Sequence, residues 1–271
     1  MLPAESDLEI RSHLPAQAGA NGARPPLLFV HGGFSDAWFW EPYFLPWFAR
    51  KGYAAHAVSL RGHGASGGVE TLFVAGLDDF AADVSRVAGA LPAPPILIGH
   101  SMGAAIVERL LSIQPVPAAA LVAPVPPAGL LAMATRLAAG QPEIAMFSQF
   151  DPARMSRHVL EALRPYYFSN DVAPEILAEA SRHLCAESPR VLLDLSMRLQ
   201  WQLPDRGGVP LFVLGAEGDR ISTPDDVRAT AEHHRVEATI VPGLAHMLML
   251  ERQWERAARE LLRWLGTLQA G

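Results

Sequence analysis

Cysteine is almost absent from the chain: Cys185 is the only one in 271 residues. A single cysteine excludes an internal disulfide and a cysteine-based zinc site. Its surroundings, "SRHLCAESP", supply neither a partner nor a signature for a catalytic thiol. We therefore interpret Cys185 as a packed side chain.

Basic clusters and long apolar runs are also lacking. Lys51 is the only lysine, and the arginines form no run or stripe in a chain of net charge −6, which argues against a nucleic-acid partner. No uncharged apolar run reaches the ~18–20 residues that a membrane span requires. The first residues, "MLPAESDLEIRSHL", lack the basic start and the apolar stretch of a signal peptide. We expect a cytoplasmic protein without a membrane span, either a monomer or a homodimer.

What the sequence does contain is an alternation of strand-like and helix-like segments. Short apolar runs alternate with segments whose apolar residues recur three and four positions apart. This alternation predicts a mostly parallel sheet with helices on both faces. The predicted strands are 27–32, 53–60, 94–101, 117–124, 210–217 and 237–243, with 7–16 as an antiparallel edge; the predicted helices are 37–52, 76–91, 102–114, one from about Thr223, and 248–265.

The alternation breaks between residues 125 and 203. This segment contains several helix-like pieces and no clear strand, and prolines mark its entry at 124, 126 and 127. The stretch "LPDRGGVP" marks its exit. We expect one α/β core, built from residues 1–124 and 204–271, with a helical insertion at 125–203.

Two serines match the pattern Gly-x-Ser-x-Gly. Ser101 follows the apolar run "PPILIGH" and precedes the helix-like "MGAAIVERLL", whereas Ser66, in "GHGASGG", has loop-like sequence on both sides. A nucleophile of this kind needs a tight turn between a buried strand and a helix, which exposes its hydroxyl at the edge of the sheet. The pattern therefore favours Ser101 as a nucleophile and Ser66 as a loop residue.

A serine nucleophile needs a base and a carboxylate that orients it. Among ten histidines, His246 follows the last predicted strand, and the loops after parallel strands reach one sheet edge. Asp219, in "VLGAEGDRIST", follows another strand and is our choice for the acid, with Glu217 as its rival. The order Ser101, Asp219, His246 is that expected of a nucleophile, an acid and a base in this architecture.

The negative oxygen of a tetrahedral intermediate needs hydrogen-bond donors that are already in place. The backbone N–H of Met102, directly after the nucleophile, is one candidate. The second should come from the loop after the strand 27–32, in "FVHGGF". We favour Gly33, with Phe34 as the alternate.

Taken together, these motifs resemble those of the α/β-hydrolase superfamily. The resemblance spans essentially the whole chain: "HGG", "RGHGAS", "GHSMG", "GAEGDR" and "GLAHMLML" follow one another in order. It implies an eight-stranded, mostly parallel sheet and identifies the insertion as a helical lid, or cap, over the active site. It also implies a catalytic triad, a nucleophile elbow, an oxyanion hole, and no cofactor or metal.

Within the superfamily, "HGGFSDAWFWEP" and "AHMLML" are similar to carboxylesterases and methylesterases of small esters, and "RGHGAS" and "GHSMG" resemble lipases of monoacylglycerols and lysophospholipids. Relatives that cleave haloalkanes or epoxides have Asp as the nucleophile, which Ser101 argues against. Hydroxynitrile lyases carry a Lys where this chain has Met247. The apolar cap, Tyr167 included, suggests an apolar substrate. Candidate substrate contacts are Phe34, His100, Met133, Met146, Phe147, Trp201 and Met247.

The sequence thus predicts a serine esterase that acts on small or amphiphilic, largely apolar carboxylic esters through an acyl-enzyme. Cleavage of a thioester, an amide or a carbon–carbon bond by the same triad stays open, because cap shape decides among them. A ligand receptor that keeps the triad and turns over slowly is the alternative of another class.

Overall fold

The computed structural model describes residues 7–16, 24–140, 157–197 and 208–268. Their centre is a sheet with the strand order β1-β3-β2-β4-β5-β6-β7, in which only β1 runs antiparallel, against β3. The order reverses at β2, which lies between β3 and β4. The strands are β1 (Ile10–His13), β2 (Leu27–Val30), β3 (Ala55–Val58), β4 (Ile96–His100), β5 (Ala119–Val122), β6 (Leu211–Ala216) and β7 (Ala238–Val241).

Every residue of β2, β3, β4 and β5 is buried, because helices cover both faces of a parallel sheet. Leu27 and Phe29 pack into one cluster, with α1 (Phe44–Arg50) and α10 (Glu255–Thr267). Leu28 and Val30 point to the opposite face and pack into a second cluster. The helices of that second face are α2 (Leu77–Ala90), α3 (Met102–Ile113) and α9 (Pro224–His233).

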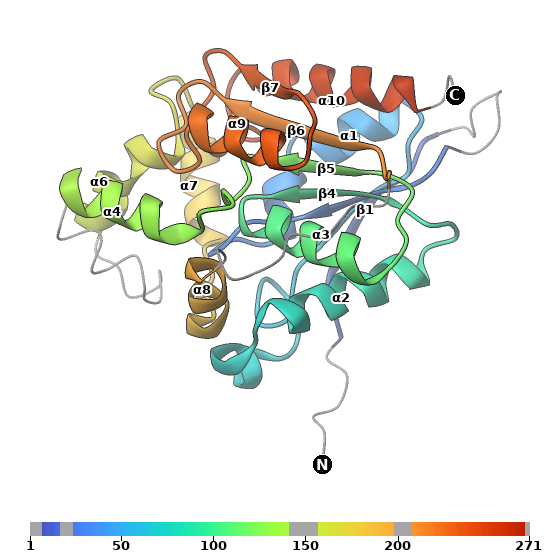
Figure 1. The fold of residues 1–271 in the computed structure, drawn as a ribbon, viewed down its shortest axis with the longest axis horizontal. Helices are drawn as coiled ribbons and strands as arrows, with labels where there is room; N and C mark the ends of the chain where they lie inside the picture. The colour runs from blue at the N-terminus through green and yellow to red at the C-terminus, as the bar shows by residue number, and fades with distance from the viewer. Residues whose placement is uncertain (1–6, 17–23, 141–156, 198–207, 269–271) are drawn as a thin grey trace.

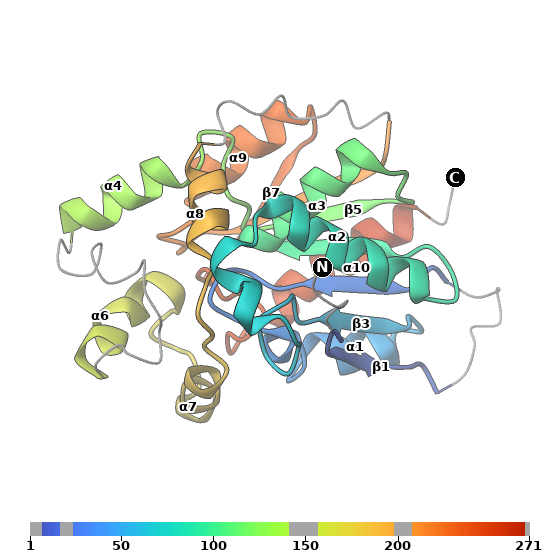
Figure 2. The same ribbon diagram turned by 90° about the horizontal axis from the view of Figure 1, so that it is seen from below.

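The insertion supplies only helices in the part that the structure describes between β5 and β6. They lie together beyond the carboxyl ends of the strands, at one side of the sheet in both views (Figures 1 and 2). We call them the cap: α4 (Leu130–Gly140), α6 (Arg157–Tyr167), α7 (Pro174–Arg182) and α8 (Pro189–Ser196). No helix of the described chain is both long and apolar enough to cross a bilayer.

Three expectations need correction. Within the described residues the sheet has seven strands rather than eight, because a single short strand, β1, precedes β2. The predicted helix 37–52 divides into a 3₁₀ turn, η1 (Ala37–Trp40), and α1, since Pro42 has no N–H to continue the helical hydrogen bonds. The last helix begins at Glu255 rather than 248, because residues 246–254 form a series of turns in which Leu248, Met249 and Leu250 are all buried.

The start of α9 is as predicted. Thr223 is its N-cap, with its hydroxyl accepting from the N–H of Asp226, and Pro224 occupies the first helical position. The second 3₁₀ turn, η2 (Val69–Val74), connects β3 to α2.

Candidate functional site

Ser101 occupies a strained turn between β4 and α3. Its φ of 53° and ψ of −115° lie in a region that residues with a side chain rarely adopt. Its N–H donates to the carbonyl of Val122 at 2.9 Å, and its carbonyl accepts from Ala104 at 3.0 Å. The turn is thereby tied both to β5 and to the first turn of α3, and it leaves the Ser101 side chain only half-buried.

The two flanking glycines allow α3 to approach the sheet closely. A Cβ at Gly99 would lie 2.2 Å from the carbonyl oxygen of Gly103, and a Cβ at Gly103 would lie 2.5 Å from the carbonyl oxygens of Val30 and His31. Neither position has room for a side chain. The lack of space for a Cβ therefore explains why glycine occupies both positions that flank Ser101 in the Gly-x-Ser-x-Gly pattern.

Ser66 has a different environment. It is buried in a turn, its hydroxyl donates to the carbonyl of Ser59 at 2.6 Å, and the same oxygen accepts from the N–H of Glu9 at 2.9 Å. These hydrogen bonds tie the loop to the residue directly after β3 and to the residue directly before β1. The Ser66 hydroxyl is thus committed to structure.

Asp219 and His246 are buried and in contact. Oδ2 of Asp219 lies 2.8 Å from Nδ1 of His246, and Oδ1 accepts from the N–H groups of Ile221 and Ser222 at 2.7 and 2.9 Å. Because the carboxylate only accepts, Nδ1 of His246 donates, which leaves Nε2 as the atom able to take a proton. Glu217, the rival acid, is exposed and does not reach His246.

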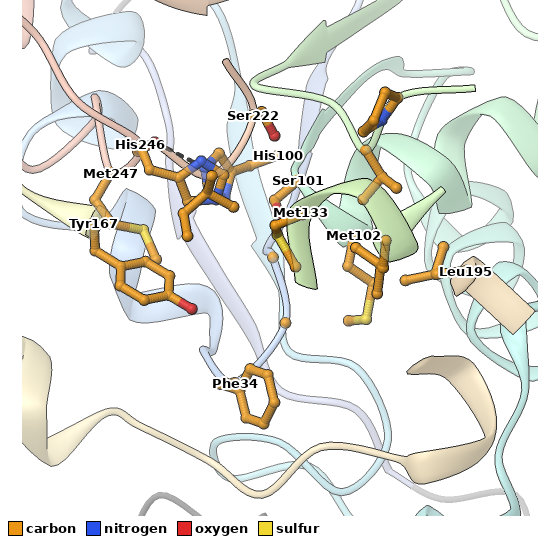
Figure 3. Close-up of a pocket in the computed structure, with 16 residues that line it drawn as sticks. Phe34, His100, Ser101, Met102, Met133, Tyr167, Leu195, Ser222, His246 and Met247 are labelled. Carbon is orange, nitrogen blue, oxygen red and sulfur yellow. Dashed lines mark hydrogen bonds between the residues drawn. The ribbon is translucent and has the colours of Figure 1, made fainter. Parts of the chain in front are cut away.

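Ser101 and His246 line the same pocket (Figure 3). Within the described residues, no hydrogen bond joins the Ser101 hydroxyl to His246, and such bonds often close only when substrate is bound. The backbone of His246 is fixed on two sides: its carbonyl accepts from Nε2 of His100 at 3.0 Å, and the next N–H, of Met247, donates to the carbonyl of Tyr167 at 2.9 Å.

The loop after β2, residues 31–36, lies beside the Ser101 turn, and we call it the oxyanion loop. The carbonyl of Gly32 accepts from Nδ1 of His31 at 2.7 Å and from the Ser35 hydroxyl at 2.9 Å. Because a peptide bond is planar and trans, this holds the N–H of Gly33 on the opposite side. The N–H of Phe34 already donates to Glu187 at 3.1 Å, so the alternate donor is occupied and Gly33 remains the candidate.

Two histidines beside the oxyanion loop, His31 and His100, are held neutral. Complete burial, with a contribution from the neighbouring His63, lowers the pKa of His31 to about 3. The Nε2 of His31 accepts from the N–H of Leu60 at 3.1 Å, as only a neutral ring can. Burial, together with His246, likewise holds the pKa of His100 well below its ordinary value.

The pocket above Ser101 is small and mostly apolar. Its volume is about 60 Å³, and its walls combine the oxyanion loop, the Ser101 turn, the cap and the loops after β5, β6 and β7. Of the expected substrate contacts, Phe34, His100, Met133 and Met247 line it, while Met146, Phe147 and Trp201 lie outside the described residues.

Several lining residues were not among the expected substrate contacts: Val125, Pro126, Leu130, Tyr167, Leu195, Ile221 and Ser222. Ile221 and Ser222 lie two and three residues after Asp219, and this proximity could have predicted their place in the pocket. The other lining residues could not be predicted in this way, because their positions depend on how the cap packs. The Tyr167 hydroxyl points into the pocket (Figure 3). Burial, and then the charge of Asp219, raises the pKa of Tyr167 to about 12, so this phenol stays protonated and can donate a hydrogen bond to a substrate.

Comparisons with known proteins agree with the fold described above. A family model described as "Alpha/beta hydrolase family" matches residues 27–260. Among solved structures, the chain is similar to a putative non-heme bromoperoxidase, BpoC, from Mycobacterium tuberculosis (20% identity, TM-score 0.73, covering 97% of this chain and 96% of that one). It is also similar to a thermophilic esterase from Thermogutta terrifontis (19%, 0.71, 99% and 96%) and a monoacylglycerol lipase from Paleococcus ferrophilus (19%, 0.69, 97% and 99%).

Curated relatives match over a shorter stretch. Protein phosphatase methylesterase 1 from Bos taurus is 36% identical over 105 residues, which is 37% of this chain. The match spans 27% of that relative's length, so it bears on part of the fold only.

Proposed function

Because the chain belongs to the α/β-hydrolase family, we propose that it is a serine hydrolase that cleaves small, largely apolar carboxylic esters. One observation carries the proposal: His246, whose Nδ1 lies 2.8 Å from Oδ2 of Asp219, lines the same pocket as a serine held at a strained strand-to-helix turn. The esterase and lipase among the similar structures, and the methylesterases that match part of the chain, support ester cleavage.

The reaction assigns a separate task to each group. The Ser101 Oγ attacks the acyl carbon while Nε2 of His246 takes its proton, and Asp219 stabilises the imidazolium that forms. The N–H groups of Gly33 and Met102 bind the negative oxygen of the tetrahedral intermediate, and one such donor contributes about 10²–10³ in rate.

Collapse of that intermediate breaks the ester bond. His246 returns its proton to the leaving alcohol, and the acyl group remains on Ser101. Water then attacks the acyl carbon with His246 as its base, and the carboxylic acid leaves as Ser101 regains its proton. No cofactor takes part in these steps.

The size of the pocket favours a short acyl group. A volume of about 60 Å³ has room for only a few water molecules. We therefore expect p-nitrophenyl acetate and propionate to be cleaved with higher kcat/KM than octanoate. Assays with thioesters, lactones and amides of matched acyl length would show which of these other bonds the same triad cleaves.

The decisive test compares the two serines. Ser101→Ala should lower kcat by about 10⁴-fold or more and abolish labelling by a fluorophosphonate probe, with the fold intact. Ser66→Ala removes a buried hydrogen-bonded hydroxyl and should retain both activity and labelling in its folded fraction. Equal losses in the two folded variants would refute the assignment, and an unlabelled wild-type protein would favour a receptor.

A further inference from the structure

We propose that Glu187, which lies between the cap helices α7 and α8, is a positioning residue for the oxyanion hole: it holds the oxyanion loop through the N–H of Phe34. The inference rests on the proposed function, and it concerns a residue that lies 153 positions from the one it contacts. Glu187 is buried and does not itself line the pocket.

Glu187 belongs to a segment that crosses the oxyanion loop. We call residues 183–188, between α7 and α8, the strap. The N–H of Cys185 donates to the carbonyl of Phe34 at 2.9 Å, and the carboxylate of Glu187 accepts from the N–H of the same residue at 3.1 Å. Further along the loop, Nδ1 of His183 lies 2.8 Å from Oδ2 of Asp36. The strap therefore binds the backbone of Phe34 on both sides.

Phe34 needs to be held in this way. Its φ of 61° is left-handed, a conformation that a bulky residue keeps only when its surroundings impose it. The peptide before Phe34 is the one that follows Gly33, the candidate donor to the oxyanion. The Gly33 N–H belongs to the preceding peptide, between Gly32 and Gly33, and its position depends on where the Gly33 Cα is held. The Glu187 contact fixes the peptide on the other side of that Cα, so its loss should let Gly33 shift and displace the donor from the acyl oxygen.

A carboxylate this close to the hole must be neutralised. A Cβ built on Gly33 would lie 3.4 Å from Oε2 of Glu187, and a bare negative charge there would oppose the developing oxyanion. His63 supplies the countercharge: Nε2 lies 3.2 Å from Oε2 of Glu187, and Nδ1 lies 2.9 Å from the carbonyl of Arg61. Both ring nitrogens face acceptors, so both carry a proton and the ring is an imidazolium.

The ionisation of His63 agrees with this geometry. Burial by itself would lower the pKa of His63, but the charge of Glu187 and its hydrogen bond raise the pKa above its ordinary value. His63 and Glu187 therefore form an ion pair without net charge. The N–H of Phe34 donates to the Glu187 carboxylate of this pair.

The test uses two isosteric variants. Glu187→Met keeps the volume but removes the acceptor, and we expect kcat for p-nitrophenyl acetate to fall about 10–100-fold with KM within about threefold. The Ki of a trifluoromethyl ketone, whose adduct carries an oxyanion, should rise in parallel. Glu187→Gln keeps an oxygen for the Phe34 N–H and should retain kcat within about tenfold of the wild type.

Glu108→Met is the matched control. Glu108 is equally buried and pairs with His234 at 2.7 Å, between α3 and α9 and away from the pocket. It should lower Tm while kcat in the folded fraction stays within twofold of the wild type. Hydrogen exchange of residues 31–36 should accelerate in Glu187→Met and stay unchanged in Glu108→Met.

The outcomes separate this inference from the proposed function. A folded Glu187→Met variant with wild-type kcat, or an equal loss of kcat in Glu108→Met, overturns the positioning role. If Glu187→Met does not fold, Glu187→Gln decides: a loss as large as that expected of the methionine variant overturns it too. A wild type that neither cleaves esters nor takes up the fluorophosphonate refutes the proposed function, and hydrogen exchange then still tests whether Glu187 holds the loop.

Discussion

Replacing Ser101 by glycine should stabilise the protein relative to Ser101→Ala, although both variants lose the hydroxyl. The turn holds residue 101 at φ 53° and ψ −115°, and the penalty for this conformation comes from the Cβ. Alanine keeps the Cβ and glycine removes it. The comparison therefore isolates the backbone strain from any loss of chemistry.

The magnitude follows from two opposing terms. A residue in such a sparsely populated region costs about 1–3 kcal/mol, while a glycine loses about 0.5–1 kcal/mol more conformational entropy on folding than alanine. The difference is about 1 kcal/mol in favour of Ser101→Gly. For a chain of this size, 1 kcal/mol shifts Tm by about 2–4 °C.

Scanning calorimetry of the two variants, with urea denaturation as a second measure, tests this expectation. The control pair is Ser66→Gly and Ser66→Ala, because Ser66 has no left-handed φ and glycine should there be less stable than alanine. If Ser101→Gly melts at or below the temperature of Ser101→Ala, the turn stores no strain and the reasoning fails.

Two further predictions concern packing and pH. Gly103→Ala should destabilise the fold by about 3 kcal/mol or more, because its Cβ would lie 2.5 Å from two carbonyl oxygens. Gly89→Ala, whose Cβ would have nothing within 4 Å, should instead stabilise the fold by about 0.5–1 kcal/mol. Urea denaturation midpoints of the two variants test this, and equal effects would contradict the close packing of α3. The lowered pKa of His31, about 3, means that below about pH 6.5 the unfolded chain binds a proton here that the folded chain does not. The free energy of unfolding should therefore decrease as pH falls from about 6.5 toward 3, by about 1.4 kcal/mol per pH unit from this residue. In His31→Gln, the free energy of unfolding should depend less steeply on pH between 6.5 and 5. An unchanged slope would contradict a neutral, buried His31.

The strands and most helices could be predicted because their signal is local. A short apolar run such as "LLFV" is buried along its whole length, as expected of a strand covered on both faces. The choice of Ser101 over Ser66 likewise used neighbouring residues, and the two turns do differ in the structure. The prediction of an undivided helix over 37–52 was wrong, although Pro42 within this segment is a local signal against a continuous helix.

The contacts of the strap could not be predicted. Glu187 is one of eight acidic residues in the insertion, and nothing near it in the sequence indicates that it reaches Phe34 or His63. Its position depends on how α7 and α8 pack against the core. The number of strands and the residues that line the pocket from the cap depended on packing in the same way.

The amino-acid sequence by itself determined the local conformations: which runs extend, which coil, and where a strand must turn sharply into a helix. Steric limits and the periodicity of apolar residues act over a few positions, so they can be evaluated without knowing the fold. The tertiary structure alone decided that Asp219, rather than its rival Glu217, meets His246, and that Glu187 meets Phe34. The physical reason is that a buried charge or amide needs a partner within about 3 Å, and only the packing of the whole chain selects which partner that is.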